Sequence, residues 1–424
     1  MSATFRENRS YQENLWAETL ADWGVEVVVI THSERGGAVH GDSTTLAQSP
    51  RGAQYTIRFI EAFTLPRNIA LTSSLSEVIL SVEPHCVVWV GALMYFGRAL
   101  YLDPRLSEIP LITIYSLSRR GRHPFRWLGG DLTWQQRVKG FAFQALRAPV
   151  LTQSIKRAQL TIANTPEATE IIRSYIWHDD RFAWARKHEE IPLGFCPYHF
   201  TYHQDRRVMI RQELNLPPNE TVALFSTRFE SDKRDALLAC YEAVNRCHAR
   251  QKLSGAPLIH MIWVGARPSE LHDELLALCA QAQAPERHHI VSFQTRAKLS
   301  AWYHASDIIL FPQPSISIQE ALGVGARVLS PPDPSIDHLH AYTDQLISAD
   351  IEYWADHLER EAKQIYSSDS QTLDSARESA ALSAGQLSYT ALVKRALLGL
   401  NSRARTLPNP LKMLIEEVRL DSRI

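Results

Sequence analysis

The chain has 424 residues, of which 45% are hydrophobic, with 45 Lys and Arg against 46 Asp and Glu. This composition indicates a globular protein long enough for two domains with substantial cores. Proteins that neutralise nucleic-acid phosphates normally carry a basic surplus, so the net charge of −1 excludes a whole-molecule argument for nucleic-acid binding, and we expect no nucleic-acid partner.

The cysteines, the first residues and the apolar segments indicate where in the cell the protein works. The five cysteines form no C-x-x-C pair, which is atypical of a disulfide framework or a structural zinc site. The first ten residues contain charges where a secretory signal would need an apolar core. The longest apolar run, 86–97, is well short of the roughly 20 residues that cross a bilayer. We therefore expect a cytoplasmic protein, with a peripheral position on the inner face of a membrane left open.

Short β-branched runs alternate with helical patterns in the first half of the chain. The runs cover 25–31, 86–90, 110–115 and 160–164. Alternation of this kind predicts a parallel sheet joined by crossover helices.

The same pattern starts again in the second half, with runs at 221–226, 258–265, 289–293, 307–312 and 326–331. The restart predicts an α/β protein of two tandem Rossmann-like, doubly wound domains whose sheet ends face a cleft, the usual place for a ligand.

A Pro- and Gly-containing segment at 191–200 separates the two series. We predict an N-terminal, acceptor-side domain over 1–195, a nucleotide-sugar-binding domain over 196–388, and C-terminal helices over 389–424 that pack back toward the first domain.

Phosphate groups need fixed cations and free backbone N–H donors, which strand ends and helix starts supply. Arg228 follows one predicted strand, and Lys233 comes five residues later; Glu320 lies in a helix that follows another strand. For each there is a simpler alternative: a surface ion pair for Arg228, and a first-turn helix acid for Glu320. Ser315 and Ser317 suit either ligand contacts or helix capping.

In their order along the chain these residues resemble the family-4 glycosyltransferases, which have the GT-B architecture of two Rossmann-like domains. The resemblance covers most of the chain. It rests on I-P-L-G-F-C-P-Y-H-F at 191–200, on the Arg228 and Lys233 element, on Y-H-A-S-D-I-I-L-F-P at 303–312, and on E-A-L-G-V-G-A-R-V at 320–328.

The resemblance implies a role for each matched position. Arg228 and Lys233 would hold the donor pyrophosphate and stabilise its charge as the sugar leaves, so that no metal and no cofactor are needed. Glu320 would accept hydrogen bonds from the donor ribose. The backbone at Thr295 and Arg296 would meet the base, and the phosphates or sugar would face the segment of Ser315, Ile316, Ser317 and Ile318.

Two features depart from the family pattern. The family usually has a second Glu eight positions before the one matched by Glu320, where this chain has Pro312 in a shortened loop. The family's first strand and Gly-rich loop should also precede Tyr11, where only ten mostly polar residues stand. Either the true start lies upstream, or the first domain is built without that strand. Tyr11 and Gln12 are acceptor-side candidates, with plain helix packing as the alternative.

A basic segment stands out in the first domain of a chain whose net charge is −1. Between Arg119 and Arg157 there are nine basic residues and one acidic residue, interleaved with aromatic residues such as Trp134 and Phe141. Such a segment suits an anionic membrane surface or a lipid-pyrophosphate acceptor; alternatively Trp134, Val138 and Phe141 pack onto the sheet. The residues that we expect at such a contact are Arg119, Arg120, Arg122 and Arg126.

The prediction is a metal-independent glycosyltransferase that moves a hexose from a nucleoside diphosphate sugar to a hydroxyl of a lipid-linked or oligosaccharide acceptor. The resemblance implies retention of the anomeric configuration and a role in polysaccharide or glycolipid synthesis. The alternative is a catalytically silent nucleotide-sugar-binding or scaffolding protein that acts with a partner.

Overall fold

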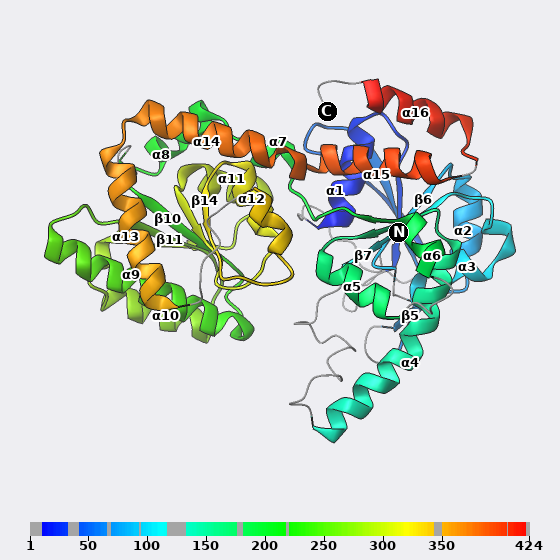
Figure 1. Ribbon diagram of the computed structural model, residues 1–424, viewed down its shortest axis with the longest axis horizontal. Coiled ribbons are helices and arrows are strands. Elements are labelled where there is room, and N and C mark those ends of the chain that lie inside the picture. Colours follow the sequence, from blue (N-terminus) through cyan, green and yellow to red (C-terminus); the bar gives the residue numbers. More distant parts are fainter. Residues whose placement is uncertain are drawn as a thin grey trace. The chain divides into compact units, whose positions relative to one another are not determined.

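The computed structural model describes residues 11–32, 42–65, 69–92, 95–116, 133–175, 181–217, 220–342, 350–404 and 406–420. The chain divides into two compact units (Figure 1). Unit 1 comprises Met1–Leu193 and Tyr389–Ile424, and unit 2 comprises Gly194–Ser388. Helices α15 (Tyr389–Arg403) and α16 (Asn409–Leu420) therefore belong to unit 1 although they follow unit 2 in the sequence.

Unit 2 is built on one continuous parallel sheet. Its strands are β10 (Val222–Ser226), β11 (His260–Ala266), β12 (His288–Ser292), β13 (Ile308–Leu310) and β14 (Arg327–Leu329), in the order β12-β11-β10-β13-β14. Every neighbouring pair is parallel. Strands β11 and β13 are buried along their whole length, as expected for strands that helices cover on both faces.

Three helices of unit 2 begin at residues whose side chains cap them. The helices of this unit are α7 (Pro197–Phe200), α8 (Gln204–Glu213), α9 (Arg234–Ser254), α10 (Glu270–Ala280), α11 (Arg296–Ala305), α12 (Ser317–Gly323), α13 (Ile351–Ser367) and α14 (Ser370–Ala384). Side chains of Ser269, Asp350 and Asp369 accept hydrogen bonds from first-turn amides of α10, α13 and α14. Helix α9 ends at Gly255, whose φ of 69° suits a left-handed cap.

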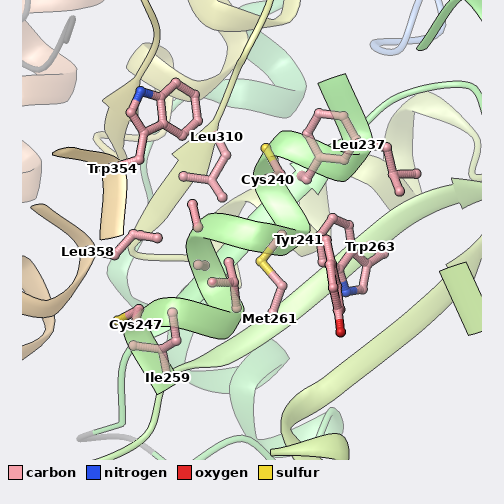
Figure 2. Packing of buried hydrophobic residues seen from close by; sticks show 14 of the residues in the cluster. Leu237, Cys240, Tyr241, Cys247, Ile259, Met261, Trp263, Leu310, Trp354 and Leu358 are labelled. Carbon is pink, nitrogen blue, oxygen red and sulfur yellow. The ribbon is translucent and has the colours of Figure 1, made fainter. Parts of the chain in front are cut away.

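The core of unit 2 lies between α9, α13 and the sheet (Figure 2). Cys240 and Cys247 of α9 are fully buried and pack in the same cluster as Trp263 of β11 and Trp354 of α13. Burial raises the pKa of the Cys247 thiol to about 12. These cysteines therefore act as small apolar core residues, as their helical spacing predicts.

A buried charge cluster ties α8 and α14 to the sheet. The Asp307 carboxylate, 5% exposed, accepts hydrogen bonds from Arg207, from Arg211 at 3.1 Å, from Arg377 at 2.9 Å and from the amide of Val222 at 2.8 Å. Although burial alone would raise it, the three guanidinium groups hold the pKa of Asp307 well below its ordinary value. The carboxylate is charged and fully partnered, which is how a buried charge is tolerated.

Unit 1 contains two sheets and a small hairpin. Strands β1 (Val28–His32), β3 (Gln54–Ile60) and β2 (Ser43–Gln48) form one sheet; β6 (Val87–Val90), β7 (Leu111–Tyr115), β8 (Leu160–Ala163) and β9 (His188–Glu190) form the other; β4 (Phe63–Leu65) pairs with β5 (Ile69–Leu71). All pairs are parallel except β2 with β3 and β4 with β5. In the part of the chain that the structure describes, β1 and β6 do not pair with each other.

The helices of unit 1 are α1 (Gln12–Asp22), α2 (Leu75–Val82), α3 (Ala99–Leu102), α4 (Trp134–Arg157), α5 (Pro166–Tyr175) and α6 (Arg181–Lys187). Helix α1 packs on α15. The carboxyl-terminal part of α4 packs on the sheet, where Tyr115 and Ser154 share a buried hydrogen bond of 2.6 Å. The other end of α4 extends away from the rest of unit 1 (Figure 1).

Each strand predicted from the sequence is present in the structure. Strands β2, β3 and β9 and the β4-β5 hairpin were not predicted. Strand β2 is mostly exposed and polar, and β9 has only three residues, so neither carries a strong apolar signal. Strand β3 does show alternation, since Tyr55 and Ile57 are buried between more exposed residues.

Candidate functional site

The carboxyl ends of the unit 2 strands meet at one edge of the sheet, because all five strands are parallel. The segments that leave this edge are 227–233 after β10, 267–269 after β11, 293–295 after β12 and 311–316 after β13. They hold the predicted residues Arg228, Lys233, Thr295 and Ser315, and the last segment leads directly into the helix of Glu320.

The segment after β10 is folded tightly against β11. The amide of Thr227 donates to the carbonyl of Val264 at 3.1 Å. Gly265 has a φ of 115°, and a Cβ there would collide with the carbonyl oxygen of Thr227. Glycine is therefore needed for this approach. The amide of Lys233 then donates to the Glu230 carbonyl at 2.9 Å, which closes the turn that presents Arg228 and Lys233.

Arg228 is half-exposed at this edge. Its side chain is 55% exposed and forms an ion pair with Glu230 at 3.3 Å. Exposed pairs of this kind contribute little to stability. The contact seen here is thus the surface ion pair given as the alternative for Arg228. Because this pair contributes little, an anionic ligand could replace Glu230 as the partner of the guanidinium at small cost.

Lys233 connects two of the edge segments. Its Nζ donates to Oε1 of Gln313 at 3.2 Å, so the segments after β10 and β13 lie together. Gln313 was not predicted as a site residue. It directly follows Pro312, the position where the family pattern has its other Glu. This place in the sequence was the signal that could have identified Gln313 as a site residue.

Glu320 is only 2% exposed. Its carboxylate acts on the buried hydroxyl of Tyr303. Burial first, and then the Glu320 carboxylate, raise the pKa of Tyr303, while the hydroxyls of Ser317 and Ser226 lower it. Gly323 lets α12 pack closely, since a Cβ there would meet the Phe200 carbonyl and the Phe195 ring. A neutral phenol therefore lies beside Glu320. Tyr303 is the first residue of the 303–312 motif, but sequence reasoning gave it no role, because only the fold brings its hydroxyl to Glu320.

The segment from Ser315 to Ile318 forms the start of α12. Oγ of Ser315 accepts from the Ser317 amide at 3.3 Å, and its carbonyl accepts from the Ile318 amide at 3.2 Å. Ile316 is the N-cap position. These contacts agree with the capping alternative for Ser315. The amides of Ser317 and Ile318 can bind a phosphate only if they give up these hydrogen bonds.

Thr295 and Arg296 form the start of α11, where the Thr295 carbonyl accepts from the Leu299 amide at 2.8 Å. Arg296 is 8% exposed. Burial, and next the Arg296 guanidinium, lower the pKa of His199 to about 4, so this side chain lies near α7. At the adjacent strand end, the Arg267 guanidinium lies 4.2 Å from the centre of the Phe293 ring, a pair that was not predicted.

In unit 1, Gln12 takes part in a polar cluster. Its Nε2 donates to Oγ of Ser116 at 3.0 Å, and its Oε1 accepts from Nδ2 of Asn164 at 2.8 Å. The same Asn164 nitrogen donates to Ser116 at 2.6 Å. Ser116 and Asn164 directly follow β7 and β8, so the cluster marks the carboxyl edge of that sheet. Tyr11 is 42% exposed at the start of α1.

The predicted contact residues Arg119, Arg120, Arg122 and Arg126 lie outside the described residues, as does the side chain of Phe141. Trp134 and Val138 are 77% and 44% exposed on the extended end of α4, so the packing alternative is wrong for these two. Of the helices that the structure describes, none is both long and apolar enough to span a bilayer. Within the described ranges, no group of three or more His, Cys, Asp or Glu could hold a metal ion.

No protein-family model matches the chain, and no curated protein matches it in sequence. Solved structures match in fold. Sucrose-phosphate synthase from Thermosynechococcus elongatus has a TM-score of 0.58 at 14% identity, with 92% of each chain covered. WaaG, a glycosyltransferase involved in lipopolysaccharide biosynthesis, has 0.58 at 13% identity, with 90% of this chain and 93% of WaaG covered.

HepE from Anabaena, solved in complex with UDP, has a TM-score of 0.60 at 14% identity, with 95% of this chain and 98% of HepE covered. At such identities the likeness concerns the fold. The chain has the fold of the GT-B glycosyltransferases, with two Rossmann-like domains, and the predicted fold class is confirmed.

Proposed function

We propose that unit 2 binds a nucleoside diphosphate sugar at the carboxyl edge of its sheet and that the protein transfers the sugar to an acceptor hydroxyl. One observation carries the proposal: Arg228, Lys233 and the buried Glu320 come to this edge from separate segments of a GT-B fold. Two cations and a buried carboxylate at one sheet edge suit a ligand with a diphosphate at one end and ribose hydroxyls at the other.

The cations would act on the bond that breaks. When the bond between the anomeric carbon and the diphosphate oxygen opens, negative charge develops on the leaving phosphate. Arg228 and Lys233 would stabilise that charge, Lys233 by exchanging its neutral partner Gln313 for a phosphate oxygen. This arrangement needs neither a metal ion nor a cofactor.

Glu320 would hold the nucleoside part. A carboxylate with two oxygens can accept from both ribose hydroxyls. Its burial beside Tyr303 excludes water, which strengthens such bonds. The main chain at Thr295 and Arg296 would contact the base, and the start of α12, from Ser315 to Ile318, would contact phosphates or sugar.

The finer parts of the proposal follow the family-4 resemblance: a hexose donor, retention of configuration, and a lipid-linked or oligosaccharide acceptor in polysaccharide or glycolipid synthesis. The UDP complex of HepE and the lipopolysaccharide role of WaaG support a nucleotide donor and a glycan acceptor by analogy of fold. In unit 1, Tyr11 and the amide and hydroxyl groups of Gln12, Ser116 and Asn164 would contact acceptor hydroxyls.

We also propose that the protein works at the inner, anionic face of a membrane. The exposed Trp134 and Val138 on the extended end of α4 would enter the interface. The basic residues between Arg119 and Arg157 would contact the headgroups.

The test is a titration of the purified protein with nucleoside diphosphates and nucleotide sugars, followed by thermal stability. A ligand at about 100 times its Kd should add roughly 2.7 kcal/mol of stability. Arg228→Ala and Lys233→Ala should each lose charge-assisted bonds worth about 1.5 to 3 kcal/mol, which weakens binding roughly tenfold to a hundredfold.

The matched control is Arg234→Ala, which removes a neighbouring arginine that pairs with Glu274 on the surface. It should leave nucleotide binding unchanged. The donor site is refuted if no nucleotide stabilises the wild type, or if Arg228→Ala and Arg234→Ala behave alike. Binding without sugar transfer to any acceptor would favour the scaffolding alternative.

A further inference from the structure

Strand β2 lies at the edge of the three-stranded sheet of unit 1. Among the described strands it pairs only with β3, in an antiparallel register that sets Ser43 opposite Phe59. Four of its six residues are exposed, and Leu46 is 69% exposed. An edge strand at the surface presents N–H and C=O groups with which a further strand can pair.

The hydrogen bonds of β3 show which groups of β2 point outward. The Thr56 amide donates to the Val27 carbonyl, on the β1 side, at 3.0 Å, and Thr56 lies opposite Leu46. Bonded and non-bonded positions alternate in an antiparallel pair, so Leu46 is a non-bonded position toward β3. The N–H and C=O of Leu46 therefore point away from β3, as do those of Thr44 and Gln48, two residues to either side.

The turn after β2 gives the same assignment. The Ser49 amide donates to the Ala53 carbonyl at 2.8 Å, and the Gly52 amide donates to the Ser49 carbonyl at 2.9 Å. Ser49 is thus a bonded position toward β3. By alternation Gln48, one residue earlier, is a non-bonded position and faces outward.

Strand β2 has none of the features that usually keep an exposed edge from pairing. Its sequence, Ser-Thr-Thr-Leu-Ala-Gln, contains no charged residue and no proline. Natural edge strands are commonly protected by lysine, proline or a bulge, and the register between β2 and β3 runs without a shift. The outer edge of β2 can therefore accept another strand.

The outward-facing positions match those of a second copy of the same strand. Two antiparallel copies of β2 that cross at Leu46 set Leu46 opposite Leu46 and Thr44 opposite Gln48. Every outward-facing residue then meets another outward-facing residue, as antiparallel hydrogen bonding requires. The two exposed Leu46 side chains lie on the same face of the joined sheet and cover each other.

Residues of opposite charge flank β2. Asp42 precedes the strand and Arg51 lies in the turn after it, and both are exposed. Antiparallel pairing about Leu46 brings Asp42 of each copy near Arg51 of the other, because the two residues lie at similar distances from Leu46 on opposite sides. Attraction at both ends therefore favours this register.

We propose that the protein forms a homodimer by antiparallel pairing of β2 with β2 of a second copy, centred on Leu46. The sheets that contain β2 in the two copies then join into one. A single pair of strands buries less than the roughly 1,600 Å² of a standard interface, so the dimer is weak and depends on protein concentration. The matching outward positions and the complementary charges select a second copy over an unrelated strand.

The experiment is sedimentation equilibrium of the full chain over a range of concentrations at low salt. We expect a reversible equilibrium between monomer and dimer. Leu46→Lys places two ammonium groups opposite each other and should weaken dimerisation about tenfold. The matched control is Leu102→Lys, at a 64% exposed leucine of the same unit outside β2, which should leave the equilibrium unchanged.

Two charge variants test the register. Asp42→Arg and Arg51→Asp each bring like charges together at both ends of the dimer, so each variant alone should dimerise about tenfold more weakly at low salt. A mixture of the two should dimerise about as well as the wild type, because the heterodimer has opposite charges at both ends. A fluorescent label on one variant detects this heterodimer. Recovery in the mixture also shows that both variants are folded.

A chain that stays monomeric at every concentration overturns the proposal. Dimerisation that Leu46→Lys does not weaken also overturns it, because the copies then meet at another surface. The same holds if the mixture of Asp42→Arg and Arg51→Asp dimerises no better than either variant alone.

Discussion

The two units share parallel strands and crossover helices, yet they differ in how complete the sheet is and in what they bury. Unit 2 has five strands in unbroken order, whereas among the described strands of unit 1 the pairing stops between β1 and β6. Unit 2 also buries the Asp307 cluster, and all five buried histidines of the described residues lie in it: His199, His248, His260, His304 and His357. The buried core of unit 1 contains no histidine in its described part.

This difference separates two kinds of function within one chain. The continuous sheet of unit 2 fixes separate segments at one edge, which is what a small, highly charged ligand needs. Unit 1 offers a feature suited to a larger partner, an exposed tryptophan on the extended end of α4 (Figure 1). The predictions below test whether the two units depend on different interactions.

The largest effect is expected from Asp307→Ala. The change leaves Arg207, Arg211 and Arg377 buried without their carboxylate. Breaking a buried ion pair by removing one partner costs about 3 to 5 kcal/mol. We expect this loss in unit 2 alone, measured by hydrogen exchange of peptides from β10 and β13 against peptides from β7 and β8.

Asp356→Ala is the control for this change. Asp356 is 63% exposed and pairs with Arg250 on the surface of the same unit, so its loss should cost less than about 1 kcal/mol. Equal destabilisation of both units by Asp307→Ala would show that they do not unfold separately, and the comparison between them would then fail.

The second effect concerns the surface of unit 1. Trp134→Ala removes a large, 77% exposed side chain from α4. If half of a roughly 200 Å² indole surface enters the interface, its loss costs about 2 kcal/mol, or roughly thirtyfold in binding to anionic vesicles. Sedimentation with vesicles containing phosphatidylserine measures this.

Leu253→Ala is the matched control, because Leu253 is a 90% exposed apolar residue of unit 2. It should leave vesicle binding unaltered. Equal binding by Trp134→Ala and the wild type would remove the membrane role from α4.

The third effect is acid sensitivity of unit 2. Burial lowers the pKa of His248 and of His304 to about 4, below the ordinary value of about 6.5. As pH falls through 6.5, histidines in the unfolded chain bind protons that the folded histidines do not. The contribution of these groups to the free energy of unfolding is therefore fully present above pH 6.5 and decreases as the pH falls toward 4. Between pH 7 and 6 the two residues should cost about 1.4 kcal/mol together.

Hydrogen exchange at pH 7 and 6, corrected for intrinsic rates, measures this decrease. It should be concentrated in unit 2, and His248→Gln should make it smaller. Unit 1 should show a smaller decrease, because burial also lowers the pKa of one histidine there, His188, to about 4. A decrease in unit 1 as large as that in unit 2 would contradict the assignment to His248 and His304.

The sequence predicted the strands that are long and apolar, since burial on both faces leaves a continuous signal. A strand end followed by a helix start is also visible locally, which is why Arg228, Lys233 and Glu320 were chosen; their donor-binding roles stay predictions. Strand β2 and the short β9 were missed, because exposed or three-residue strands carry almost no periodicity.

Site residues that depend on tertiary contacts could not be predicted in the same way. Tyr303 lies far from Ser226 in the sequence. It becomes a site residue only because α11 places its hydroxyl near Glu320. The Gln12, Ser116 and Asn164 cluster joins residues 152 positions apart. The order of the described strands in unit 1, in which β1 pairs with β3 and β6 with β7, depends on pairing partners, which a single sequence does not show.

The smallest effect is expected from Gln313→Glu, and it tests whether unit 2 is the donor-binding unit. The side-chain amide of Gln313 is uncharged, so it leaves the charge of Lys233 intact while its Oε1 accepts from the Lys233 Nζ at 3.2 Å. A carboxylate at this position would neutralise the ammonium and repel a phosphate, at a cost of about 1 kcal/mol near solvent, or roughly fivefold in nucleotide affinity. Because the effect is electrostatic, it should shrink with added salt. Gln313→Ala, which removes the hydrogen bond without adding charge, should change the affinity less. Calorimetry with the nucleotide that stabilises the wild type decides the matter: if Glu and Ala at this position give the same affinity at low salt, the segment after β13 does not face the phosphates, and the shortened loop lies outside the donor site.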